Sequence, residues 1–178
     1  TSSGITIDLS SAVSQSVVSG SLEIKLTGTF TTISGTTFAD NISGTTGVDT
    51  IWADSGADTI YGDAGADTIY GGADADTIDG GADVDTIDGG TGNDTITGGT
   101  GNDIIDGGDD TDTFDESDST SNITVVLENA SGTSTSAVEG TDTLTNIENV
   151  TTGSGADDFT LSDSGLNVIS ASSGTDTV

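Results

Sequence analysis

The sequence predicts an all-β protein, a β-solenoid in which short strands stack coil upon coil. Three observations support this prediction. An aspartate recurs every nine residues from Asp40 to Asp112, and a large apolar residue stands two positions after each aspartate. A glycine stands five positions before nearly all of these aspartates. Because the three features keep one phase along the chain, they describe one structural unit that is used many times.

Each nine-residue unit divides into a six-residue turn and a three-residue strand. Side chains alternate between the two faces of a strand, so the middle, apolar residue of each strand points inward. Two units make one coil with a strand on each side, and stacked coils bury a ladder of apolar residues between two parallel sheets. The ladder comprises Ile42, Ile51, Ile60, Ile69, Ile78, Ile87, Ile96, Ile105 and Phe114.

The aspartates are candidate metal ligands. With two units in a coil, turns on the same edge of the solenoid come from alternate repeats, which places the carboxylates in two rows. One row holds Asp40, Asp58, Asp76, Asp94 and Asp112, and the other holds Asp49, Asp67, Asp85 and Asp103. Calcium prefers carboxylate and carbonyl oxygens. We expect it between neighbours in each row, at about seven positions, with Asp112 at the end of its row.

The turn glycines are the second part of these candidate sites. A glycine can take backbone angles that a Cβ atom would forbid, so its carbonyl group can turn toward an ion. The candidates are Gly62, Gly65, Gly71, Gly72, Gly80, Gly81, Gly89, Gly90, Gly92, Gly98, Gly99, Gly101, Gly107 and Gly108. Asp74, Asp83 and Asp110 replace the glycine at the fourth position of their turns.

One repeat, GGTGNDTIT from Gly89 to Thr97, fits the pattern GGxGxDxUx at every fixed position. This resembles the RTX (hemolysin-type) calcium-binding nonapeptide repeat. The resemblance implies a right-handed parallel β-roll, with calcium between successive turns and backbone carbonyls completing each site. A solenoid whose aspartates only cap the turns is the alternative interpretation, because aspartate is common in turns.

Charge limits the possible partners. The net charge is −30 and the only basic residue is Lys25, so nucleic acid and anionic membranes are poor partners, whereas divalent cations are attracted. Membrane insertion is not expected, because no apolar run approaches the length needed to cross a membrane. Few aromatic residues and a high net charge usually indicate disorder. We therefore expect folding to depend on bound metal.

The chain divides into four predicted segments. Residues 1–34 and 116–152 lack the glycine pattern and are predicted to be β spacers or caps, with strands at 5–9, 22–26, 123–127 and 142–150. Residues 35–115 form the β-roll, beginning with a degenerate repeat at 35–43. Residues 153–178 begin a second, degenerate repeat block. Several matches between the two spacer-plus-repeat units lie 117 or 118 residues apart, among them Gly35 with Gly153.

Three aromatic residues, Trp52, Tyr61 and Tyr70, stand at the last, outward position of their repeats. Trp52 and Tyr70 are expected to be neighbours on one sheet. They either pack beneath a flanking cap or form a patch for sugar binding or assembly.

The absence of His and Cys argues against an enzyme, because no base stands near a serine nucleophile. Two functions are then compatible with the sequence. The first is a calcium-binding structural module of a secreted array, such as a surface layer, adhesin or filament, which contacts neighbouring modules. The second is a calcium-triggered secretion and folding module of an enzyme or toxin. The resemblance implies an extracellular or cell-surface location and type I export, through a signal expected outside this sequence.

Overall fold

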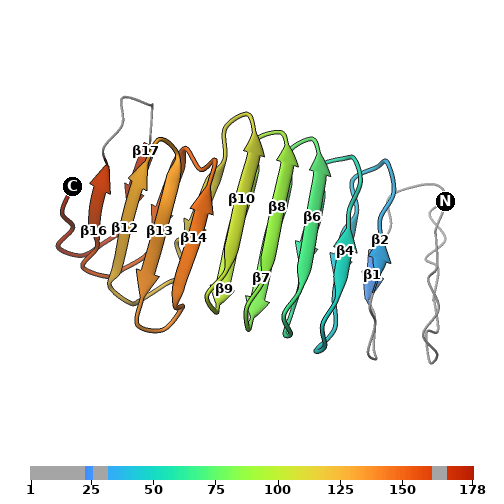
Figure 1. Cartoon of the computed structure of the whole chain (residues 1–178), viewed down its shortest axis with the longest axis horizontal. Coiled ribbons are helices and arrows are strands. Elements are labelled where there is room, and N and C mark those ends of the chain that lie inside the picture. The colour runs from blue at the N-terminus through green and yellow to red at the C-terminus, as the bar shows by residue number, and fades with distance from the viewer. Residues whose placement is uncertain (1–22, 26–31, 162–167) are drawn as a thin grey trace.

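The computed structural model describes residues 23–25, 32–161 and 168–178. Every regular element in these residues is a β-strand, and the strands form an elongated two-sheet solenoid (Figure 1). Among the described residues, no helix is long and apolar enough to cross a membrane. The predicted strand at 5–9 and most of the predicted segment 1–34 lie outside the described residues.

The strands alternate between two sheets. The first sheet contains, in spatial order, β1 (Glu23–Lys25), β3 (Asn41–Ser43), β5 (Thr59–Tyr61), β7 (Thr77–Ala82), β9 (Thr95–Thr100), β11 (Thr113–Glu116), β15 (Asn149–Thr152) and β17 (Val168–Ala171). The second sheet contains β2 (Ile33–Ser34), β4 (Thr50–Trp52), β6 (Thr68–Ala73), β8 (Thr86–Thr91), β10 (Ile104–Asp109), β14 (Thr141–Thr145), β13 (Ser131–Ser136), β12 (Ile123–Glu128) and β16 (Asp158–Leu161). In Figure 1 the second sheet faces the viewer, and the coils advance along the long axis.

The register of the sheets confirms that two repeats make one coil. In the second sheet Ile51 pairs with Ile69 and Ile69 with Ile87, and in the first sheet Ile60 pairs with Ile78. Each residue therefore lies beside the residue of the same repeat position one coil away. The same register continues beyond the repeats, where Ile105 pairs with Leu144 and Phe114 with Val150.

The core is the predicted apolar ladder. Its isoleucines from Ile42 to Ile105 are no more than 1% exposed, and Phe114 is fully buried. The neighbours of each ladder residue along its strand are more exposed, as in the pattern of Thr50, Ile51 and Trp52. Leu144, Ile147, Val150 and Phe159 extend the same core past the repeats. A one-residue shift in register would expose the whole ladder, so the apolar pattern fixes the pairing.

From Asp54 to Asp110 the second position of every repeat has a left-handed backbone conformation, and so does the fourth position except at Gly101. Gly90, at a second position, has φ +105°, and a Cβ atom there would lie 2.1 Å from the carbonyl oxygen of Gly72 in the neighbouring coil. Asp74, Asp83 and Asp110 adopt φ values of 77°, 78° and 85° at the fourth position. Aspartate tolerates this region better than most residues do. Replacement of glycine by aspartate therefore leaves the turn geometry intact.

The segment after Asp115 differs from the expectation in one respect. The predicted single strand at 142–150 is wrong, because β14 ends at Thr145 in the second sheet and β15 begins at Asn149 in the first. A turn at Asn146, with φ 52°, separates the two strands. The strands β12, β13 and β14 form an antiparallel meander between β10 and β16. The division of the chain into folding units at residues 34, 115 and 152 remains a prediction.

Candidate metal sites

The structure arranges the repeat aspartates in the two expected rows, one on each edge of the solenoid. Each aspartate is the last residue of a turn and stands directly before a strand. From Asp58 onward, its Oδ1 atom accepts a hydrogen bond from the backbone N–H of the aspartate one coil earlier. The N–H of Asp40 donates to Asp58, and the N–H of Asp49 donates to Asp67, both over 2.7 Å. The N–H of Asp58 in turn donates to Asp76 over 2.8 Å. The same bond continues to Asp85, Asp94, Asp103 and Asp112.

The second carboxylate oxygen has a different environment. In most of the row it is buried and has no hydrogen-bond partner. These atoms are Oδ2 of Asp58, Asp67, Asp76, Asp85, Asp94, Asp103 and Asp112. In the first two turns a threonine provides hydrogen bonds to this oxygen. Oδ2 of Asp40 accepts from Thr36, and Oδ2 of Asp49 accepts from Thr45. A buried carboxylate oxygen without a hydrogen-bond partner destabilises the folded state. A row of such oxygens therefore indicates that they bind a cation.

Glycine at the first repeat position leaves space beside all of these oxygens except that of Asp58, whose repeat begins with Ala53. A Cβ atom on Gly89 would lie 2.5 Å from Oδ2 of Asp94 and 2.5 Å from the carbonyl oxygen of Gly107, one coil further on. The corresponding distances at Gly71 are 2.7 Å to Asp76 and 2.6 Å to Gly89. A carboxylate oxygen of one coil and a carbonyl oxygen of the next thus converge beside a glycine. This donor set suits a hard cation such as calcium.

The other candidate glycines lie in the last residues of the longer strands or in the turns that follow. Gly62, Gly80, Gly98 and Gly107 occupy the same first position as Gly71 and Gly89, and Gly65, Gly92 and Gly101 occupy the fourth. The glycines at the second position all have positive φ. A Cβ atom on any of them would lie 1.9–2.1 Å from a carbonyl oxygen of the preceding coil; they are Gly72, Gly81, Gly90, Gly99 and Gly108. A side chain at the second position would therefore collide with the neighbouring coil. Metal binding by the carbonyls of these glycines remains a prediction.

Electrostatics favours a cation at these positions. The pKa of Asp76 and Asp85 is raised to about 7, mainly by burial and to a smaller extent by the neighbouring aspartates, against the opposing effect of the Oδ1 hydrogen bond. Burial likewise raises the pKa of Asp58, Asp67 and Asp112 to about 6. Lys25 is the only basic residue of the chain, so basic side chains cannot neutralise the rows.

Two row members were missed in the sequence. Asp142 continues one row, because its Oδ1 accepts the N–H of Asp103 over 3.1 Å. Glu148 continues the other, because its Oε2 accepts the N–H of Asp112 over 2.9 Å. The expectation that Asp112 ends its row is therefore wrong, because Glu148 follows it. Asp142 and Glu148 each precede an apolar core residue by two positions, but they lack the glycine five positions earlier that marks the repeats.

The carboxylates act in pairs rather than in larger groups. Among the described residues, no three acidic side chains come close enough together to bind a metal ion by themselves. Backbone carbonyls, such as those beside Gly71 and Gly89, would have to complete the coordination of calcium, which takes six to eight oxygens.

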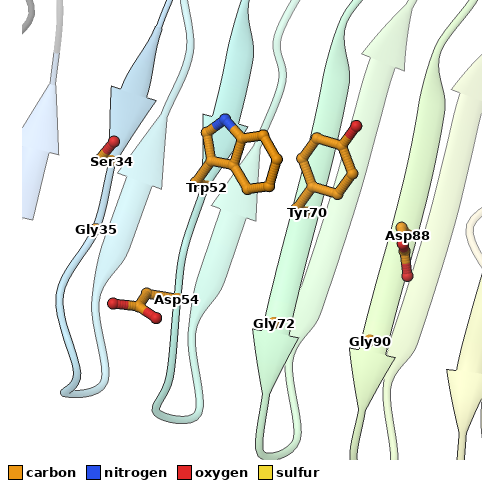
Figure 2. Close-up of a pocket in the computed structure, with 8 residues that line it drawn as sticks. All are labelled: Ser34, Gly35, Trp52, Asp54, Tyr70, Gly72, Asp88 and Gly90. Atoms are coloured by element: carbon orange, nitrogen blue, oxygen red, sulfur yellow. The ribbon is translucent and has the colours of Figure 1, made fainter.

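A separate feature lies on the outer face of the second sheet. Trp52 and Tyr70 are neighbours there, as expected, and their rings stack with centroids 3.9 Å apart and planes 13° from parallel. Figure 2 shows the two rings side by side, with Gly72 and Gly90 further along the neighbouring strands, where they also line a groove. Asp54 and Asp88 also line this shallow groove. Trp52 remains 47% exposed, so no described residue covers the stack.

The geometry of the rows agrees with comparison to known families. The model of the family described as "RTX calcium-binding nonapeptide repeat (4 copies)" matches the chain at residues 34–69, 54–87, 61–96 and 79–114. Comparison with curated proteins gives no match. The matched residues coincide with the turns that carry the two aspartate rows. Residues 34–114 therefore belong to the family of RTX calcium-binding nonapeptide repeats.

Proposed function

We propose that the chain is a calcium-binding structural module of a secreted extracellular array, such as a surface layer, adhesin or filament, which calcium folds and stiffens. The observation that carries this proposal is the continuity of the two sheets. Both run from the repeats through β14 and β15 to β16 and β17. A solenoid contacts itself only coil to coil, so further modules added in this way would extend a rod.

The proposed calcium ligands are the aspartates of the two rows and the carbonyl groups of the turn glycines. The nine aspartates from Asp40 to Asp112 leave seven intervals between neighbours, and Asp142 and Glu148 stand beyond them. Seven calcium ions would change the net charge from −30 to −16. They would remove repulsion along each row, and their binding free energy would contribute directly to folding.

An extracellular location fits this chemistry. Extracellular modules can use weak calcium sites, with dissociation constants of about 0.1–1 mM, because calcium is plentiful there. The chain has no cysteine, so disulfides cannot staple the fold. Calcium supplies the crosslinks between coils that a secreted protein otherwise obtains from disulfides.

The alternative is a calcium-triggered secretion and folding module that serves an enzyme or toxin located elsewhere in a longer protein. The spacing of about 117 residues between Gly35 and Gly153, and between Asp40 and Asp157, favours the array, because it indicates tandem modules. Asp157 in the second unit repeats the aspartate geometry, since its Oδ1 accepts the N–H of Ile123 over 3.0 Å.

The test is a comparison of a chain that carries several modules in millimolar calcium and in chelator. We expect circular dichroism to report β structure in calcium and its loss in chelator, with magnesium a poor substitute because it requires a smaller octahedral site. Electron microscopy should show ordered sheets or filaments in calcium that disperse in chelator. Isolated particles in both conditions would argue for the secretion module, and a β spectrum unchanged by chelator would contradict calcium-dependent folding.

A further inference from the structure

Glu116 breaks the repeat pattern at the end of β11. It stands nine residues after Gly107, at the first turn position, where the repeats place glycine to leave room beside the aspartate row. Its side chain is 5% exposed, and its Oε1 atom has no hydrogen-bond partner. A buried carboxylate oxygen without a partner requires either a proton or a cation.

A second unpartnered oxygen lies on the adjacent strand. Thr152 of β15 pairs directly with Glu116 of β11. Thr152 is fully buried, and its Oγ1 atom also lacks a hydrogen-bond partner. Two polar side chains at one register position are thus both buried without partners. This coincidence indicates a ligand shared by the two, because a buried polar group without a partner destabilises the folded state.

Backbone oxygens lie beside the next residue of the chain, Gly153. The turn after Glu116 passes over Gly153, which follows Thr152 in the chain. A Cβ atom on Gly153 would lie 1.9 Å from the carbonyl oxygen of Ser119 and 2.7 Å from that of Ser117. The carbonyl of Ser119 also accepts the N–H of Ser154 over 2.9 Å. Only a glycine allows this approach, which resembles the close approach of carbonyls in the repeat turns.

The charges around Glu116 are all negative. Asp142, Glu139, Asp115 and Asp103 lie near enough to act on its carboxylate. Glu139 accepts a hydrogen bond from the hydroxyl of Ser119 over 2.8 Å, which fixes one of these carboxylates beside the turn. The chain's only basic residue, Lys25, lies in β1, at the opposite end of the first sheet from β17 (Figure 1).

We propose that Glu116 and Thr152 form a further calcium site, outside the nonapeptide pattern, with the carboxylate and the hydroxyl as side-chain ligands and with carbonyls of the Ser117–Ser119 turn as additional donors. An all-oxygen donor set with one carboxylate is suited to calcium. The site lies where the chain leaves β11 and crosses to β12, past β14 and β13 of the second sheet. A calcium ion there would fasten this crossing to β15.

The test is calorimetric calcium titration of the whole chain, comparing the native protein with Glu116→Gln, Thr152→Val and Glu128→Gln. The control, Glu128, is an exposed residue at the end of β12, and its substitution removes the same charge. We expect Glu116→Gln to bind one calcium ion fewer per chain, Thr152→Val to weaken or lose the same ion, and Glu128→Gln to bind like the native protein. Glu116→Gln should remain folded in calcium, because glutamine keeps the shape of the side chain.

The competing interpretation is a buried glutamic acid that keeps its proton. Glutamine imitates the protonated acid, so on that interpretation Glu116→Gln would bind the full number of calcium ions and unfold at the same or a higher temperature. That result would overturn the proposal. Infrared spectra in calcium at neutral pH give a second measurement that does not depend on stoichiometry. Loss of a protonated-carboxyl band in Glu116→Gln would also overturn the site, whereas the absence of such a band in the native protein supports it.

Discussion

From Asp58 to Asp112, each aspartate of the two rows uses its two oxygens differently. Oδ1 accepts the N–H of the preceding coil, as between Asp58 and Asp76, and this bond orients the carboxylate. Oδ2 is buried without a hydrogen-bond partner at the position that a cation could occupy. One side chain thus joins two coils and also presents an oxygen to the space between them. Asparagine could retain the first role but not the second, since it can accept at one oxygen but carries no charge.

Substitution of Asp76 separates these roles. Asp76 lies mid-row, bonded to Asp58 on one side and Asp94 on the other. We expect Asp76→Asn to lower the number of bound calcium ions by at least one and to lower the unfolding temperature in calcium. Asp88→Asn, on the outer face of β8, should leave the stoichiometry unchanged. Calorimetric titration measures both variants, and equal stoichiometry for the two would contradict a metal site in the row.

The sequence predicted the residues of the rows only where the repeats follow one another without interruption. The aspartate and the apolar residue two positions later, recurring every nine residues, placed Asp40 to Asp112 on their edges. Asp142 and Glu148 were missed because they lie beyond this uninterrupted run and lack the glycine that usually marks a repeat. Their turns are irregular, and only the hydrogen bonds to Asp103 and Asp112 assign them to the rows.

At the scale of the strands, periodicity determined how much could be predicted. Strands β3 to β11 repeat every nine residues, so one correct register fixes all the others. The meander of β12, β13 and β14 has no such period. Its strands pair antiparallel within a parallel sheet, and the pairing depends on contacts that a local pattern does not contain. The sequence therefore predicted strands in this segment but not their order or the break at Asn146.

The stacked rings of Trp52 and Tyr70 join β4 to β6 on the outer face of the second sheet. Aromatic pairs contribute about 0.5–1.5 kcal/mol beyond the area they bury. We expect a double-mutant cycle of Trp52→Ala and Tyr70→Ala, measured by denaturant unfolding in calcium, to give a coupling free energy in that range. Tyr61 is the control, because it lies on the first sheet, where it pairs with Asp79. A cycle of Trp52 with Tyr61 should give no coupling, and equal values for both cycles would contradict a specific stack.

At the scale of the whole molecule, the rows bring like charges together at the spacing of neighbouring strands. A net charge of −30 on 178 residues already disfavours a compact state through self-repulsion. The rows add buried carboxylates to that repulsion. The apolar ladder is only one residue wide in each sheet, so little core is available to offset the charge. Protons and calcium ions are the two species that can neutralise the rows, and they compete for the same oxygens.

This competition predicts that acid stabilises the calcium-free fold and weakens calcium binding. Burial raises the pKa of Asp76 and Asp85 from 3.8 to about 7. Between these values the folded state holds more protons than the unfolded state, so without calcium the stability falls as pH rises from about 4 to about 7. We expect the calcium-free chain to unfold at a higher temperature at pH 4.5 than at pH 7.5, measured by circular dichroism.

Acid should also reduce the stabilisation that calcium provides. Because calcium requires ionised carboxylates and protons occupy the same oxygens, the increase in unfolding temperature caused by a fixed calcium concentration should become smaller as pH falls from about 7 to about 5. The double variant Asp76→Asn, Asp85→Asn provides the control, because it lacks two of the titrating groups and should show a shallower dependence on pH in the absence of calcium. A calcium-free stability that is unchanged or lower at pH 4.5 would show that the row carboxylates are not the groups that oppose folding. The cause of calcium dependence would then have to lie outside the two rows.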